Sequence, residues 1–293
     1  MIYNTQTYID MVSYMRPEGS VAQKQFCQKY LEPVFGQPDQ AGNYILRIGK
    51  PKIAYMSHHD TVHDKSGRQK VAIDSEFAYS VDGNCLGADC TTGIYIMLRM
   101  IQAGVEGLYI VHAAEEVGCK GSSYIATQTP EVVQGIDFAI SFDRYGYNSI
   151  ITHQMGMRTC SDKFADSLEF CLDLGYNCDT RGSYTDSNEY TALVAECTNI
   201  SVGYFSQHTK KESQDLIFMD QVADAFINAD MSSLLVDRDC TTDTPLLDDS
   251  FTDLDLEQIV AQHPKSVAKL LQSFGYSANG LREDIQEVRN YYY

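Results

Sequence analysis

Three histidines and an aspartate gather in one short stretch, Ser57-His58-His59-Asp60-Thr61-Val62-His63, directly after the apolar run 53–56. Such a run is typical of a buried strand. Side chains two residues apart on an extended chain point the same way, so His58 and Asp60 would face together. His58 could then bind a metal ion while Asp60 accepts its other ring N–H and fixes the tautomer. Alone, such a loop is more often a solvated turn.

Further side chains of metal-binding type follow other apolar strands downstream. They are Asp89, Glu115, Glu116, Asp143 and His208. Two imidazoles with several carboxylates suit zinc or a similar borderline divalent ion, rather than calcium. One ion would use three or four of these groups. Two ions explain so many carboxylates better, because their charge offsets the repulsion between packed acids.

Strand-like and helix-like segments alternate between these residues. The expected strands are 44–48, 52–57, 108–112, 138–142 and 200–204, and the expected helices are two within 4–33, then 94–102, 161–174, 186–195 and 213–230. Ser20 is expected to cap the second helix. Residues 64–85 indicate an excursion with a hairpin that turns at Asp82-Gly83. Polar residues at strand ends predict an α/β fold, with a central mixed, largely parallel sheet flanked by helices and the site at one sheet edge.

The composition changes after residue 235. Residues 236–253 are acidic, rich in threonine and poor in apolar side chains, which is typical of a linker. Residues 254–293 return to helical patterning, but forty residues are marginal as an independent core, so this extension is expected to dock on the main domain or on a partner. The predicted organisation is a main domain over 1–235, the linker 236–253 and a small helical extension over 254–293.

Charge and cysteine content limit the partners and the compartment. The 293 residues include 40 acidic and 22 basic side chains, for a formal net charge of −18. This charge repels phosphate backbones, which argues against nucleic acid as a partner, and it favours the approach of cationic substrates. Nine cysteines without a CxxC pair indicate reduced thiols. With neither a signal-peptide pattern nor an apolar run of membrane-spanning length, we expect a cytoplasmic protein that does not contact a membrane.

Five segments, in their order along the chain, resemble the motifs of the di-zinc exopeptidases. They are SHHDTVH, DGNCLGADCTTG, HAAEEVGCKGS, SFDRYG and YFSQHTKKE. This clan includes leucyl-type aminopeptidases, tripeptidases and the acetylornithine-deacetylase and carboxypeptidase branch. The resemblance runs from about residue 4 to 230 and leaves 236–293 outside. Five motifs in the right order are a far more specific signal than any one of them.

The resemblance implies two divalent metal ions, with zinc favoured, and five protein ligands. Asp89 would bridge the two ions. His58 and Asp143 would complete the first site, and Glu116 and His208 the second.

Three further residues receive catalytic roles by the same resemblance. Asp60 would orient the first histidine ligand, and Glu115 would be the general base. A hydroxide bridging the ions would attack the scissile carbonyl, while Glu115 takes its proton and returns it to the leaving nitrogen. Tyr184, in RGSYTDSNEY, would contact the oxyanion. The alternative for that segment is ordinary helix capping by Thr185 or Asp186.

The chain departs from the family pattern at two places. Cys90 stands where family members usually have a second aspartate, in GADD. The interval from Asp143 to His208 is too short for the lid and dimerisation domain of the deacetylase branch, which favours a single catalytic domain without a lid. The long excursion from His58 to Asp89 nevertheless resembles the lidded branch. As in the family, the Asp89–Cys90 peptide bond is expected to be cis.

Other polar residues have ordinary explanations. His112 is expected to be a satisfied core histidine, and His59 and His63 are expected at the surface or behind the ligands. Arg144 and Arg181 have two open roles, binding a substrate carboxylate or pairing with one of the many acids.

The sequence thus predicts a metal-dependent hydrolase of a peptide or amide bond, in the first place an aminopeptidase acting on short peptides. A carboxypeptidase specificity is left open. One alternative is a non-peptide amidohydrolase or deacylase on the same scaffold, and the other is a non-catalytic metal-binding protein. A homo-oligomer, or a partner docked through 254–293, is also left open.

Overall fold

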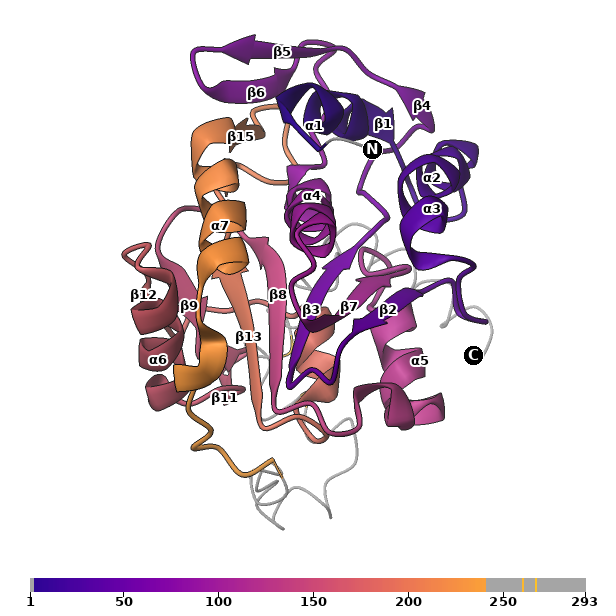
Figure 1. Cartoon of the computed structure of the whole chain (residues 1–293). Helices are drawn as coiled ribbons and strands as arrows, with labels where there is room; N and C mark the ends of the chain where they lie inside the picture. The colour runs from indigo at the N-terminus through magenta and orange to yellow at the C-terminus, as the bar shows by residue number, and fades with distance from the viewer. Residues whose placement is uncertain (1–2, 241–259, 261–266, 268–293) are drawn as a thin grey trace. The chain divides into compact units, whose positions relative to one another are not determined.

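A seven-stranded sheet runs through the molecule in the order β12-β9-β13-β8-β3-β7-β2 (Figure 1). The structure is a computed structural model that describes residues 3–240, Val260 and Val267. Its strands are β2 (Tyr44–Ile48), β3 (Ile53–His58), β7 (Gly107–His112), β8 (Phe138–Arg144), β9 (Ser149–Ile151), β12 (Asn177–Asp179) and β13 (Glu196–Ser201). The pairs β3/β7, β3/β8, β13/β8 and β12/β9 are parallel, whereas β2/β7 and β13/β9 are antiparallel. The predicted mixed, largely parallel α/β sheet is confirmed.

The chain divides into two compact units, Met1–Asp243 and Thr244–Tyr293. The predicted helical extension over 254–293 lies outside the described residues, except for Val260 and Val267, and so does the predicted linker beyond residue 240. No helix among the described residues is both long enough and apolar enough to span a bilayer.

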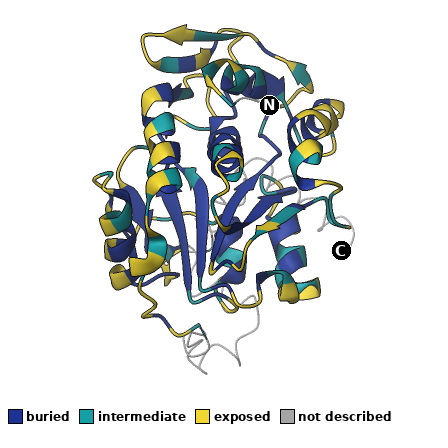
Figure 2. Ribbon diagram, viewed as in Figure 1, coloured by how far each residue is buried: buried dark blue, intermediate teal, exposed yellow. Residues whose placement is uncertain are grey.

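Alternate residues of the central strands pack on opposite faces of the sheet. Tyr55 and Phe142 belong to one apolar cluster. The same cluster holds residues of the helices α1 (Thr5–Val12), α4 (Ala88–Gln102), α6 (Asp162–Leu172) and α7 (Leu216–Asn228). Met56 and Ala139 belong to the cluster of the other face, which holds Ile125 of the fifth helix. Because both faces are covered, every residue of β3 is buried, and the central strands are dark blue in Figure 2.

The helices of the described unit surround this sheet. They are α1 (Thr5–Val12), α2 (Val21–Phe26) continued by a π-turn (Cys27–Leu31) and α3 (Glu32–Phe35), α4 (Ala88–Gln102), α5 (Lys120–Gln128), α6 (Asp162–Leu172) and α7 (Leu216–Asn228). The Ser20 hydroxyl accepts the N–H of Gln23 and caps α2, as predicted. Helix α4 begins six residues before its predicted start at Ile94. The predicted helix 186–195 is a short 3-10 helix, Asp186–Tyr190, after which the chain enters β13.

The excursion between β3 and α4 holds a hairpin, at the top of Figure 1, whose turn was wrongly predicted. Strands β5 (Val71–Asp74) and β6 (Phe77–Ser80) are joined at Ser75-Glu76, where Ser75 has a φ of +56°. Asp82, predicted in the turn, instead accepts the N–H of Lys70 with its carboxylate. The hairpin forms a second sheet, in the order β14-β15-β6-β5, with strands that flank the His208 loop. These are β14 (Tyr204–Phe205) and β15 (Ser213–Asp215).

The carboxyl ends of β3, β7 and β8 meet at one edge of the main sheet. From β3 the chain continues to β7 on one side and later to β8 on the other, so the strand order reverses next to β3. Ligands of open α/β sheets bind at such a reversal. His58 is the last residue of β3, and Asp143 lies near the end of β8. Two of the predicted metal ligands, His58 and Asp143, therefore lie at the sheet edge where open α/β folds bind their ligands.

Candidate metal centre

His58 and Asp60 form the innermost part of the site. Both side chains are buried, and the Nδ1 atom of His58 lies 3.3 Å from Oδ1 of Asp60. Asp60 also accepts the backbone N–H groups of Glu115 and Glu116, at 3.1 and 3.0 Å. One carboxylate thus lies beside the ring of His58 and fixes the loop that carries the glutamate pair. The role of Asp60 in orienting His58 stays a prediction, because Nδ1 of His58 has no hydrogen-bond partner in the described structure.

Asp89, Glu116 and His208 meet from three distant segments. Asp89 lies in the first turn of α4, and its Oδ2 atom is 2.7 Å from Nε2 of His208. The same nitrogen lies 3.3 Å from Oε1 of Glu116, an atom that is buried without a hydrogen-bond partner in the described structure. A buried carboxylate oxygen that lacks a donor is costly unless a cation is bound beside it.

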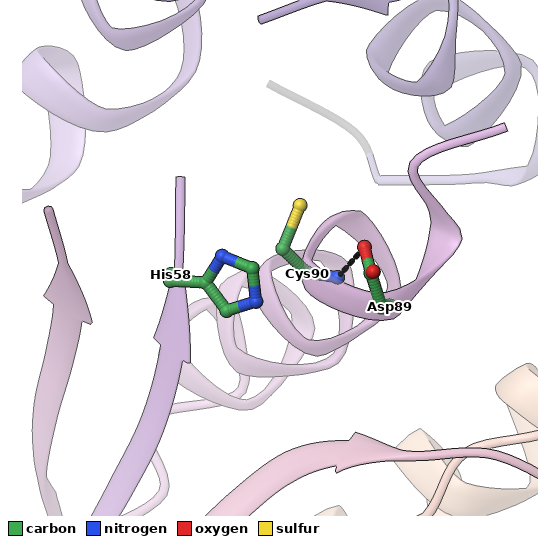
Figure 3. Close-up of side chains that lie close together, drawn as sticks. All are labelled: His58, Asp89 and Cys90. Carbon is green, nitrogen blue, oxygen red and sulfur yellow. Dashed lines mark hydrogen bonds between the residues drawn. The ribbon is translucent and has the colours of Figure 1, made fainter. Parts of the chain in front are cut away.

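Three groups of side chains could each hold an ion, with one ligand atom from every residue and all such atoms within 4.8 Å of one another. The groups are Asp89/Glu116/His208, His58/Glu115/Glu116 and His58/Asp89/Cys90. The last is drawn in Figure 3. Because the groups share members, they describe one continuous site. Its imidazoles and carboxylates fit a borderline divalent ion such as zinc.

Asp143 lies at the end of β8 but belongs to none of these groups. Its Oδ2 atom accepts a hydrogen bond from the Thr185 hydroxyl at 2.9 Å, and its backbone is held by Asn199. Thr185 directly precedes the 3-10 helix, but its hydroxyl holds the Asp143 carboxylate and makes no capping hydrogen bond to that helix. The role of Asp143 as a ligand stays a prediction.

The two other predicted catalytic residues have clear surroundings. Oε2 of Glu115 lies 4.0 Å from Nε2 of His58, and both residues belong to the His58/Glu115/Glu116 group. The Tyr184 hydroxyl donates to Oε1 of Glu189 at 2.5 Å. Glu115 therefore lies beside the candidate ligands, whereas Tyr184 is held in a separate hydrogen bond.

The acids of the site repel one another. Burial, reinforced by the charge of Asp89, raises the pKa of Glu116 to about 7. Burial likewise raises the pKa of Asp143 to about 6. The His208 pKa rises to about 11: burial opposes its charged form, but the nearby carboxylates of Asp89 and Glu116 outweigh burial. Without an ion, the cluster keeps a proton on His208, and a bound cation would supply the same compensating charge.

Glu212 is a positioning residue that sequence reasoning missed. Its buried carboxylate accepts the backbone N–H groups of Leu86, Gly87 and Ala88 at 2.7, 3.0 and 2.8 Å. It therefore caps α4 directly before Asp89, from a position four residues after His208. Such a cap satisfies otherwise unpaired donors and stabilises the earlier helix start. The only sequence signal was an acidic residue in the HTKKE segment.

Several polar residues prove to be structural. His112 is fully buried; its Nδ1 atom lies 3.1 Å from Oδ2 of Asp186, and Nε2 is 2.7 Å from the Tyr190 hydroxyl. His112 is therefore a core histidine, as expected, and Nε2 has a hydrogen-bond partner, but Nδ1 has none in the described structure. Arg144 and Arg181 both pair with Asp179, so the ion-pair alternative describes them.

The cis bond expected after Asp89 is absent, because every described peptide bond is trans. Ala88, Asp89 and Cys90 form the first turn of α4, and the Cys90 N–H donates to Oδ1 of Asp89 at 2.8 Å (Figure 3).

Comparison with known proteins gives matches in structure alone. No protein-family model matches the chain, and no curated protein matches it. A tripeptidase from Staphylococcus aureus superposes with a TM-score of 0.63 at 14% identity, over 76% of this chain and 95% of that one. The aminopeptidase PepT from Bacillus cereus gives 0.59 at 14% identity, over 76% and 95%. The TET1 peptidase from Pyrococcus horikoshii gives 0.59 at 12% identity, over 80% and 100%. The chain has the fold of these peptidases, which is the fold that its five motifs implied.

Proposed function

We propose that this chain is a metal-dependent aminopeptidase that hydrolyses short peptides at a site for two divalent ions, preferably zinc. The observation that carries the proposal is the meeting of Asp89, Glu116 and His208, whose ligand atoms lie within 4.8 Å of one another, beside His58 and Glu115. The site lies at the strand-end edge of a fold shared with solved aminopeptidases and a tripeptidase.

The protein's contribution would be to hold the ions and to move one proton. His58 and Asp143 would hold one ion, Glu116 and His208 the other, and Asp89 both. Bound ions would polarise the scissile carbonyl and lower the pKa of the attacking water.

Glu115 would take a proton from that water and pass it to the leaving nitrogen. Two features support this role. Its carboxylate lies beside His58 and Glu116, and burial raises its pKa well above the usual value, which favours a group able to hold and return a proton.

Asp60 would act through its neighbours. It faces Nδ1 of His58, which leaves Nε2 as the metal-binding nitrogen. Its bonds to the N–H groups of Glu115 and Glu116 would fix the separation between the base and a ligand. Tyr184 remains the proposed oxyanion contact, and the substrate must then compete with Glu189 for its hydroxyl.

All nine cysteines are free, which supports a reducing compartment, and the cytoplasm is the proposed location.

The test is hydrolysis of matched substrates by the zinc-loaded protein. Dipeptides and tripeptides with a free α-amine would be compared with their N-acetylated forms and with simple N-acyl amino acids. An aminopeptidase cleaves only the first set. Preferential cleavage of the N-acyl compounds would instead identify a deacylase or carboxypeptidase on the same scaffold. Absence of turnover with ions bound would leave a metal-binding protein.

A further inference from the structure

A thiol lies among the candidate metal ligands. Cys90, in the first turn of α4, is fully buried. Its Sγ atom, a ring nitrogen of His58 and a carboxylate oxygen of Asp89 all lie within 4.8 Å of one another (Figure 3). His58 comes from β3, whereas Asp89 and Cys90 come from α4, and the packing of these two elements holds the cluster together. Asp143 is not a member of this group.

A buried cation contacts the same sulfur. Arg16 is fully buried, and its Nη2 atom lies 2.9 Å from Sγ of Cys90 and 2.8 Å from the Thr91 hydroxyl. The other guanidinium nitrogens donate to the carbonyl oxygens of Met11 and His59. None of these four partners is a carboxylate. A buried charge is costly unless a nearby group of opposite charge compensates it.

We propose that the Sγ atom of Cys90 is a ligand of the ion held by His58 and Asp89. On binding, the thiol S–H bond breaks, its proton leaves to solvent, and a sulfur–metal bond forms without any change of oxidation state. The resulting thiolate accepts the Arg16 hydrogen bond and supplies the negative charge that this guanidinium lacks. The inference rests on the proposed metal site.

A thiolate ligand changes which ion the site selects. Thiolates favour zinc and cobalt, whereas carboxylates and water alone suit magnesium and manganese. With sulfur in its coordination shell, the His58 site should retain zinc against a large excess of magnesium or manganese. The Asp89/Glu116/His208 group contains no sulfur and should exchange its ion more readily.

X-ray absorption at the zinc edge of the full-length, zinc-loaded protein tests the inference without any substitution. The expected spectrum contains a sulfur shell at about 2.3 Å beside nitrogen and oxygen at about 2.0–2.1 Å. A shell of nitrogen and oxygen alone would overturn the thiolate ligand and leave the proposed enzyme standing. Failure to retain any ion would overturn both.

Cobalt substitution then identifies the cysteine. The wild-type protein should show a thiolate-to-cobalt charge-transfer band in the near ultraviolet, which Cys90→Ser should abolish while the visible cobalt bands remain. Cys119→Ser is the matched control, because Cys119 is also buried and its Sγ lies 3.8 Å from Oε1 of Glu115, but it belongs to none of the ligand groups. A band that persists in Cys90→Ser, or that disappears in Cys119→Ser, contradicts the proposal.

Discussion

Two histidines lie side by side at the ends of neighbouring parallel strands. His58 of β3 is in register with His112 of β7, and both are buried. Each has an aspartate on its Nδ1 side, Asp60 at 3.3 Å for His58 and Asp186 at 3.1 Å for His112. By strand position, burial and carboxylate partner the two are nearly equivalent.

The other ring nitrogen separates them. Nε2 of His112 is 2.7 Å from the Tyr190 hydroxyl, so both of its nitrogens have polar neighbours inside the core. Nε2 of His58 faces the acidic site, with Oε2 of Glu115 4.0 Å away. A buried His–Asp pair is therefore not by itself a sign of a metal site. The environment of the second nitrogen decides whether the pair is structural or available for a ligand.

The largest expected effect on activity comes from Glu115, the acid that lies near Nε2 of His58 and has no counterpart among the described residues near Nε2 of His112. Glu115→Gln should lower the turnover number by about 10²–10⁴ because the general base is lost, while the fold and the bound ions are retained. Steady-state hydrolysis of a dipeptide measures the turnover number, and metal analysis of the same sample measures the bound ions. Full activity with the ions in place would assign the base to another residue.

The paired aspartates give the next contrast. Asp60→Asn should weaken zinc binding about 10–100-fold, because the ring of His58 loses its orienting carboxylate. Asp186→Asn changes the corresponding partner of His112 and should leave zinc affinity unchanged. Competition with a chromophoric chelator measures both variants. Equal losses would mean that the two pairs serve the metal site alike.

His112→Phe should show the reverse behaviour. The change leaves Asp186 and the Tyr190 hydroxyl without their partner, at an expected cost of about 1–3 kcal/mol in the free energy of unfolding. Zinc affinity should not change. Urea denaturation of the ion-free protein gives the stability. A variant as stable as the wild type would show that this buried network is dispensable.

His208 provides a third histidine and a pH test. Burial opposes the charged form of His208, but the carboxylates of Asp89 and Glu116 outweigh burial and raise its pKa to about 11. The ring therefore carries a proton at neutral pH that an ion must displace. The His208 proton alone should therefore make the apparent zinc affinity rise by up to about tenfold per pH unit between pH 6 and 8. Chelator competition across that range measures the slope. His208→Ala should flatten it, and an equally steep slope in that variant would contradict the assignment.

Local patterns predicted much of this arrangement. The apolar run before His58, the alternation of strands and helices, and the cap at Ser20 depend on residues close together in sequence, and the structure contains all three. The motif order also pointed to the fold. These features are visible in a sequence because neighbouring residues determine them.

Features that need distant partners were not predicted. The early start of α4 depends on Glu212, whose three donors lie more than a hundred residues away. The burial of Arg16 depends on the sulfur and hydroxyl of α4. The hairpin turn was misplaced because Asp82-Gly83 has favourable turn chemistry, while the pairing of β5 with β6 puts the turn at Ser75.

The most direct test of the metal centre is the number of zinc ions retained by three proteins after exhaustive dialysis: the wild type, His58→Ala and His112→Phe. We expect two ions per chain in the wild type, two in His112→Phe, and no more than one in His58→Ala. An unchanged zinc content in His58→Ala, or an equal loss in both variants, would contradict the claim that, of these two strand-end histidines, only His58 belongs to the metal centre.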